Sequence, residues 1–198
     1  MKNLVIVISS NNKNKLREYK EIFEPYKNVI IKSLSEMNID VDPIENGNTF
    51  QENSLIKANA VTNLTDEYVI ADDSGLEILA LDNFPGIHSS RFMKGHTYQE
   101  KCQAIFDMLK DKKRDAQFHC VITLAKHKEK PIFFEGIVPG HISDIFTGTS
   151  GFGYDPIFIP DGFTKTYAEL GEEEKNKISH RAKASEKLID YLKTNKLI

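Results

Sequence analysis

Two neighbouring carboxylates, Asp72 and Asp73, follow directly on the apolar run Tyr68-Val69-Ile70-Ala71. The run predicts a buried strand, and Asp72-Asp73-Ser74-Gly75 is expected to be the turn at its end. Adjacent side chains on an extended backbone point in opposite directions, so one carboxylate is expected to face a crevice and the other to support the loop. Carboxylate oxygens suit a hard cation such as Mg²⁺, although a solvated turn has the same composition.

A third candidate carboxylate is Glu45, in the polar segment Glu45-Asn46-Gly47. The next acidic residue, Glu52, has a structural explanation, because Thr49-Phe50-Gln51-Glu52 fits a capping box at the start of a helix. Glu45 is therefore the better candidate for chemistry.

The segment Ser10-Asn11-Asn12-Lys13-Asn14-Lys15 lies between an apolar run, Leu4 to Ile8, and a helical pattern from Lys15 to Phe23. Small polar residues before a helix leave backbone N–H groups available to an anion, and a lysine adds a full charge. A polar turn with an N-cap would look similar. The segment lacks the glycines and the spacing of a Walker loop.

The fourth candidate combines Gly151-Phe152-Gly153-Tyr154-Asp155-Pro156 with Lys175 and Ser179-His180-Arg181. Glycines on both sides of an aromatic ring allow a ligand close to the backbone, and the ring can stack on a base. Cations in the first turn of the last helix are unfavourable unless an anion binds nearby. Together the four segments indicate a site for a nucleotide and Mg²⁺ that has neither a Walker nor a Rossmann signature.

Strands and helices alternate early in the chain and strands cluster later, from Phe118 to Gly140. Capping boxes are also predicted at Thr97 to Glu100 and Thr166 to Glu169, and the last helix is expected to begin near Ser179. This order favours one α/β unit with a mixed sheet, in which the middle segment could form a second lobe.

The composition limits the partners. Of 198 residues, 40% are hydrophobic and the formal net charge is −3, which is ordinary for a globular protein and argues against a nucleic-acid partner. No apolar run has the length of a membrane helix, so we expect no membrane partner and a cytoplasmic location. The two cysteines, Cys102 and Cys120, are expected to be buried, reduced thiols.

Six motifs, in chain order, resemble those of the inosine triphosphate pyrophosphatases, the Ham1-like enzymes that act on non-standard purine nucleotides. The motifs are Ser10-Asn11-Asn12-Lys13-Asn14-Lys15, the stretch from Glu45 to Asn53, Ala71 to Leu76, Pro85-Gly86 with Ser90-Arg91, Gly151 to Pro156, and Ser179-His180-Arg181. The resemblance covers nearly the whole chain, 1–198, as a single enzymatic domain. It implies an α/β fold with an elongated mixed β-sheet, flanking helices and two lobes around a central active-site cleft.

The resemblance also implies an activity: Mg²⁺-dependent hydrolysis of ITP, dITP and XTP to the monophosphate and pyrophosphate by a homodimer. Asp73 would be the base and a metal ligand, and Glu45 the second metal carboxylate. Residues for phosphate and metal-bound water would be Ser10, Asn11, Asn12, Lys13, Asn14, Lys15 and Ser74, with Lys175 on phosphate. Residues for base and sugar would be Phe152, Gly153, Tyr154, Asp155, His180 and Arg181, whose donors to the O6 atom of the purine would discriminate against adenine.

One departure from the family pattern is Asn11, which stands where the family has glycine. Asn adopts positive φ more readily than other non-glycine residues, so the turn can survive. Two rival functions remain open. A related enzyme of the Maf type would lack the Phe-Gly-Tyr-Asp and Ser-His-Arg segments, and a nucleotide sensor without catalysis would lack the acidic residues.

Overall fold

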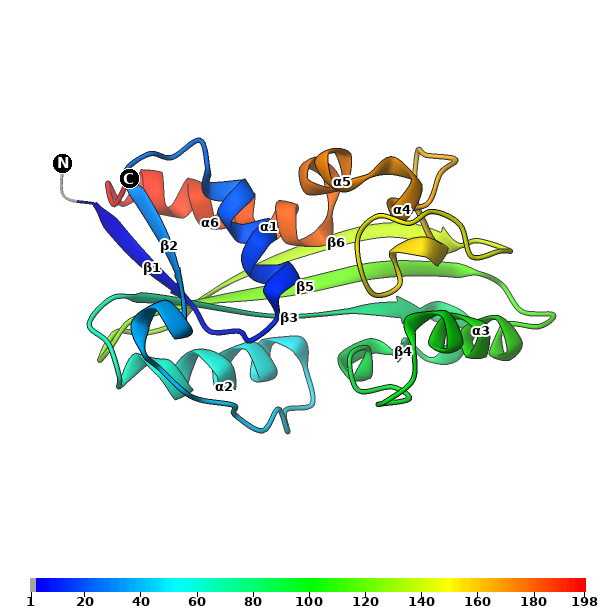
Figure 1. Cartoon of the computed structure of the whole chain (residues 1–198), viewed down its shortest axis with the longest axis horizontal. Coiled ribbons are helices and arrows are strands. Elements are labelled where there is room, and N and C mark those ends of the chain that lie inside the picture. Colours follow the sequence, from blue (N-terminus) through cyan, green and yellow to red (C-terminus); the bar gives the residue numbers. More distant parts are fainter. Residues whose placement is uncertain (1–2) are drawn as a thin grey trace. The chain divides into compact units, whose positions relative to one another are not determined.

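The computed structural model describes residues 3–198 and contains two compact units, each assembled from separate stretches of chain (Figure 1). The first consists of Met1–Asp73, Cys120–Gly136 and Arg181–Ile198, and the second of Ser74–His119 and Ile137–His180. Three long strands contribute residues to both units: β3 (Tyr68–Ile78), β5 (Asp115–Ala125) and β6 (Ile132–Ile142).

A mixed sheet of seven strands has the order β2-β1-β3-β5-β6-β7, with β4 paired to β3. The strand β1 (Leu4–Ile8) is parallel to both β2 (Val29–Ser33) and β3. The short strands β4 (Phe84–Pro85) and β7 (Phe158–Pro160) pair antiparallel with β3 and β6. The expected α/β fold with a mixed sheet and flanking helices is confirmed, whereas the single enzymatic domain and the central cleft stay predictions.

In the first unit, helices cover both faces of the sheet (Figure 1). Helices α1 (Lys13–Phe23) and α6 (His180–Thr194) lie on one face, and α2 (Phe50–Thr62) lies on the other. Alternation along β1 explains the two layers, because Ile6 and Ile8 join the core under α1 and α6 while Val7 joins the core under α2.

The second unit has an aromatic core. Phe118 of β5 packs edge-on against Phe158, with ring centroids 4.8 Å apart, and lies 5.8 Å from the ring of Tyr167. The helices of this unit are α3 (Tyr98–Met108), α4 (Tyr167–Leu170) and α5 (Glu172–Ile178). Four 3₁₀ turns complete the fold of the two units: Ser35–Met37, Leu79–Leu81, Gly86–His88 and Asp155–Ile157.

Helix starts test the predicted capping boxes. Both reciprocal bonds are present at Thr97 with Glu100 and at Thr166 with Glu169, so these two boxes are confirmed. At Thr49 only half of the box forms: Oγ1 of Thr49 accepts the Glu52 N–H at 3.0 Å, but the Glu52 carboxylate accepts the N–H of Asn48 at 2.6 Å. Glu52 reaches one residue further back than predicted.

The strand β3 corrects a prediction. It continues through Asp72-Asp73-Ser74-Gly75 to Ile78, so the expected turn after Ala71 is wrong. Polar residues of this kind usually end a strand because water solvates them, but here Asp72 and Asp73 are buried and paired with cations. The helix α5 was also missed, and Ser179 is the residue at its C-terminal cap.

Two further expectations concern burial. Cys102 and Cys120 are buried free cysteines, as predicted, and burial raises the pKa of Cys102 to about 12. Within residues 3–198, no helix combines the length and apolar character needed to cross a membrane.

Candidate active site

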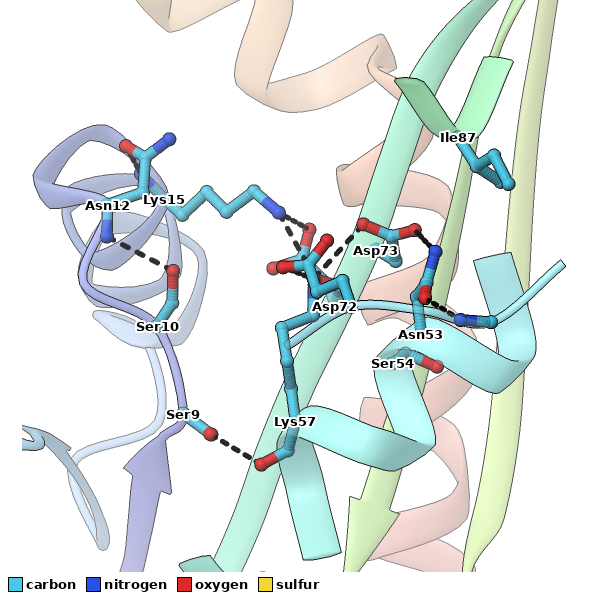
Figure 2. A network of polar contacts seen from close by, with 12 residues as sticks. Ser9, Ser10, Asn12, Lys15, Asn53, Ser54, Lys57, Asp72, Asp73 and Ile87 are labelled. Atoms are coloured by element: carbon cyan, nitrogen blue, oxygen red, sulfur yellow. Dashed lines mark hydrogen bonds and ion pairs between the residues drawn. The ribbon is translucent and has the colours of Figure 1, made fainter. Parts of the chain in front are cut away.

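The carboxylates of Asp72 and Asp73 lie at the centre of the candidate site, in the part of β3 that belongs to the first unit. Figure 2 shows that they have different partners: Lys15 of α1 reaches Asp72, whereas Asn53 and Lys57 of α2 reach Asp73. Because α1 and α2 cover opposite faces of the sheet, the alternation of the strand separates the two carboxylates, as the sequence predicts.

Asp72 is enclosed by cations. The ammonium of Lys15 is 3.0 Å from Oδ2 of Asp72 and donates to the Asp72 carbonyl oxygen at 3.1 Å. The guanidinium of Arg181 donates to the same Oδ2 from Nη2 at 2.8 Å and from Nε at 3.3 Å. Its Nη1 forms a short contact with the carboxylate of Glu18. Arg181 therefore joins β3 to α1 within the first unit.

The protonation of Asp72 follows from this arrangement. Burial alone would raise the pKa of its carboxyl, but Arg181 and Lys15 hold the pKa far below its usual range. Burial would likewise lower the pKa of Arg181, and Asp72 and Glu18 raise it well above its usual value. Asp72, Glu18 and Arg181 are therefore all charged and neutralise one another. The carboxylates of Asp72 and Glu18 supply the anions that the sequence led us to expect near the cations at the start of α6.

Asp73 is held at both carboxylate oxygens. Its Oδ1 accepts from Nζ of Lys57 at 3.0 Å, and its Oδ2 accepts from Nδ2 of Asn53 at 3.1 Å. The Asn53 side chain in turn accepts the N–H of Gly47 at 2.9 Å. A Cβ at Gly47 would lie 2.7 Å from Cβ of Glu52, so this close approach of the loop to α2 requires glycine.

The same Lys57 ammonium also contacts Glu45, whose Oε1 is 2.9 Å away. Glu45 and Asp73, the two carboxylates expected to hold a metal, therefore converge on one positive centre. Burial would lower the pKa of Lys57, but Asp73 and Glu45 raise it above its usual value, so Lys57 is an ammonium at neutral pH. Sequence reasoning did not select Lys57.

The segment before α1 forms a capped helix start. The side chain of Asn12 accepts the N–H groups of Asn14 at 2.9 Å and Lys15 at 3.3 Å, and Oγ of Ser10 accepts the Asn12 N–H at 3.2 Å. Asn11 does not have positive φ, so the turn does not need the conformational freedom of the family's glycine. Asn11, Asn12 and Lys13 are exposed, where an anion could reach them.

In the second unit, Asp155 organises the glycine-aromatic loop. Its Oδ2 accepts the Phe152 N–H at 2.7 Å and an ammonium proton of Lys175 at 2.7 Å. Lys175 lies over the ring of Phe152, 4.4 Å from its centroid. Gly151 has φ +78°, and a Cβ there would lie 2.2 Å from Asp155 Oδ2, so the loop needs glycine at this position.

Tyr154 anchors the glycine-aromatic loop to neighbouring parts of the second unit. Tyr154 is buried, its hydroxyl donates to the Ser89 carbonyl at 2.9 Å, and its ring meets Tyr98 of α3 edge-on at 5.5 Å. The intervening Gly153 has φ +68°. Gly151, Phe152 and Gly153 are thus the partly exposed members of this loop.

His180 lies flat against Phe118, with ring centroids 4.7 Å apart and an interplanar angle of 8°. Its side chain is buried among the aromatic residues of the second unit. Because Phe118 also packs against Phe158, the stack fixes the plane of the imidazole.

The structure thus brings the candidate residues together in two groups. The first unit groups Lys15, Glu45, Asp72, Asp73 and Arg181, and the second groups Phe152, Gly153, Tyr154, Asp155 and Lys175. Ser74 follows Asp73 on β3 and is partly exposed in the second unit.

Three residues that the sequence analysis did not select belong to the first group: Glu18, Asn53 and Lys57. Asn53 and Lys57 are four residues apart on α2 and therefore share one helix face. Polar side chains at this four-residue spacing, in the helix that follows the candidate Glu45, are the sequence feature that could have identified them.

A mixed sheet covered by helices, two carboxylates on one strand that pair with lysines of the flanking helices, and a glycine-aromatic loop define an α/β protein suited to phosphorylated ligands. The chain matches the Ham1 family over residues 6–191. It belongs to this family.

Relatives with known names agree with the match. The chain is 43% identical to the dITP/XTP pyrophosphatase of Clostridium perfringens, with 94% of this chain and 96% of the relative aligned. It is 42% identical to the dITP/XTP pyrophosphatase of Caldanaerobacter subterraneus, with 96% of each chain aligned.

Two solved structures support the fold. The Ham1 protein of Staphylococcus aureus superposes with a TM-score of 0.86 at 38% identity, covering 96% of this chain and 99% of the other. A HAM1 protein from Coxiella burnetii gives 0.88 at 38% identity with the same coverage.

Proposed function

We propose that this protein hydrolyses dITP, XTP and ITP to the nucleoside monophosphate and pyrophosphate. The observation that carries the proposal is the cluster of Asp73, Glu45 and Lys57 in a chain that aligns over 94–96% of its length with proteins named dITP/XTP pyrophosphatases. A pyrophosphatase of this type needs a base for water and positive charge for phosphates, and the first unit supplies both.

Asp73 is the proposed general base. Water would form a new bond to phosphorus as the α–β phosphoanhydride bond breaks, and the proton of the water would pass to the Asp73 carboxylate. Asn53 and Lys57 fix the two oxygens of Asp73, so the base is oriented before substrate binds. The Lys15 ammonium, beside Asp72, and the exposed residues Asn11 to Lys13 before α1 are the proposed contacts for phosphate oxygens.

The residues fit a magnesium ion. Oxygens of Glu45 and Asp73 converge on a single cationic centre, and Mg²⁺ is commonly held by one or two carboxylates together with substrate phosphates and water. In residues 3–198 no group of three or more His, Cys, Asp or Glu side chains is arranged to hold a metal ion. Glu45 and Asp73 would hold Mg²⁺, which would neutralise charge on the phosphates.

The second unit is the proposed selector of the base. His180 and the N–H groups of the glycine-aromatic loop are candidate donors to the O6 atom of hypoxanthine or xanthine, and adenine would leave such donors unpaired. Lys175 is paired with Asp155 beneath Phe152, which supports a role in holding this loop. A homodimer and a cytoplasmic location complete the proposal, and sedimentation of the pure protein tests the first of these.

Product analysis tests the reaction. The pure protein is incubated with dITP, XTP or dATP and Mg²⁺, and nucleotides and pyrophosphate are separated by chromatography. We expect dIMP and pyrophosphate from dITP, with dATP hydrolysed at least about tenfold less efficiently. A diphosphate and orthophosphate would contradict the proposal, and tight binding without turnover would favour the nucleotide sensor.

Removal of the metal is a separate test. With excess chelator we expect no measurable hydrolysis, because two carboxylates would repel a triphosphate without a bridging cation. Added Mg²⁺ should restore turnover, whereas Ca²⁺ should support little because its bonds are longer and its geometry is looser. Full activity in chelator would exclude the metal from the mechanism.

A further inference from the structure

Lys57 is a buried cation whose proposed role in hydrolysis is limited to orienting Asp73. Its side chain is only 9% exposed, and its ammonium lies 2.9 Å from Glu45 and 3.0 Å from Asp73. These are the two carboxylates proposed to hold a divalent cation. One positive charge therefore lies next to both of the carboxylates that would attract the metal.

The position of Lys57 is built into the fold. The residue lies within α2, its backbone carbonyl accepts the hydroxyl of Ser9 at 2.8 Å, and Asn53, one turn earlier, engages the other oxygen of Asp73. The helix that carries the ammonium to the two carboxylates is thus bonded to the residue that directly follows β1.

We propose that Lys57 is an internal counter-ion that competes with the divalent cation for Glu45 and Asp73. This inference rests on the proposed function, because it takes these residues as the metal ligands. An ammonium within 3.0 Å of both carboxylates lowers the affinity of the free protein for a divalent ion through charge repulsion. Phosphate oxygens of a nucleotide provide an alternative anion for the ammonium, so metal binding is coupled to nucleotide binding.

Asp73 does not depend on Lys57 alone for its orientation. Asn53 holds its second oxygen, and Gly47 holds Asn53. Removing the Lys57 ammonium therefore leaves the charges of Glu45 and Asp73 without their shared cation, while the hydrogen bond from Asn53 still orients Asp73. For this reason the variant is expected to bind a divalent ion more tightly, where a purely structural lysine would give weaker binding.

Mn²⁺ alone is the probe, and its binding is followed by electron paramagnetic resonance with wild type, Lys57→Met, Lys57→Gln and Lys57→Arg. We expect the two neutral variants to bind Mn²⁺ at least about tenfold more tightly than wild type. Lys57→Arg keeps the charge and should show no gain. Lys20→Met is the control for net charge, because Lys20 lies on α1 and pairs with the exposed Glu36.

Thermal unfolding provides a second readout that does not require turnover. Two carboxylates without their shared cation repel each other, so Lys57→Met should melt below wild type, and Mn²⁺ should raise its melting temperature more than that of wild type. If Lys57→Met does not fold, Lys57→Gln carries the same test.

The inference is overturned if the neutral variants bind Mn²⁺ as weakly as wild type or more weakly, or if none of the proteins binds Mn²⁺. Either result leaves the proposed function standing when wild type still converts dITP to dIMP and pyrophosphate. Absence of that conversion would refute the proposed function, and tighter Mn²⁺ binding in the neutral variants would still support competition by Lys57.

Discussion

The two units of this protein use polar and aromatic residues in opposite ways. In the first, two buried side chains of β3 are charged: Asp72 pairs with Lys15 and Arg181, and Asp73 pairs with Lys57. In the second, rings pack on rings, and the buried ion pair of Lys175 and Asp155 lies under the ring of Phe152.

This difference has a functional reading. Charges held at fixed positions suit a reaction centre common to every nucleoside triphosphate, because all of them carry the same phosphates. Flat rings and backbone N–H groups suit the part of a nucleotide that varies, which is the base. We therefore expect substitutions in the first unit to affect all substrates alike and those in the second to change the preference among them.

The largest expected effect comes from Arg181→Ala in the first unit. The change leaves Asp72 and Glu18 buried without their shared cation, and breaking a buried pair costs about 3–5 kcal/mol. Urea unfolding measures the loss. Arg17→Ala is the matched control, since Arg17 forms an exposed pair with Glu21 and should change stability by no more than about 0.5–1 kcal/mol.

The same variant tests the expectation that Arg181 donates to the base. The contacts of Arg181 with two carboxylates predict that hydrolysis of dITP and dATP declines by a similar factor. A narrowed ratio of the two kcat/KM values in Arg181→Ala would support the role in base selection that the family resemblance implies.

Asp73→Asn should reduce turnover of every nucleotide by at least about 100-fold, because an amide is a poor base and a weaker metal ligand. The fold should persist, as the amide keeps the shape of the carboxyl. Steady-state kinetics at saturating Mg²⁺ measure kcat, and Asp190→Asn, at an exposed position of α6, is the control. Near-normal kcat in Asp73→Asn would remove this residue from catalysis.

Phe118→Leu should have a smaller effect confined to base preference. It removes the flat surface under His180, and an aromatic pair contributes about 0.5–1.5 kcal/mol, so the ratio of kcat/KM for dITP over dATP should fall roughly three- to tenfold. Phe134→Leu, in the core of the first unit, is the matched control and should leave the ratio unchanged. If the ratio of kcat/KM for dITP over dATP is the same in the two variants, Phe118 has no role in base selection.

The smallest effect concerns how stability depends on the protonation of Glu36, an exposed residue of the 3₁₀ turn Ser35–Met37 in the first unit. Its carboxylate accepts the N–H of Ser33 at 2.7 Å and the Ser33 hydroxyl at 2.8 Å, which lowers its pKa to about 2. A lowered folded pKa means that its contribution is present above about pH 4.3 and is lost as pH falls toward 2. Acid unfolding of Glu36→Gln should show a shallower decline than wild type over this range.

Local sequence patterns predicted much of the fold. The capping boxes at Thr97 and Thr166 were correct because their hydrogen bonds join residues only three positions apart. The turn after Ala71 was wrong because the cations that neutralise Asp72 and Asp73 come from distant segments. Arg181, for example, lies 109 residues from Asp72.

The same limit applies to the site. The cations at the start of α6 indicated a nearby anion, but the pattern did not show that Asp72 and Glu18 supply it. Lys57 was missed because a lysine within a helix resembles a solvated residue until the helix is placed against β3. Side chains whose partners are remote in sequence are the part that the sequence alone did not predict.

One comparison tests the division of labour between the units most directly: kcat/KM for dITP and for dATP in wild type, Asp73→Asn and His180→Ala. We predict that Asp73→Asn lowers both values by the same factor and that His180→Ala narrows the ratio between them. A changed ratio in Asp73→Asn, or an unchanged ratio in His180→Ala, would contradict the assignment of chemistry to the first unit and base selection to the second.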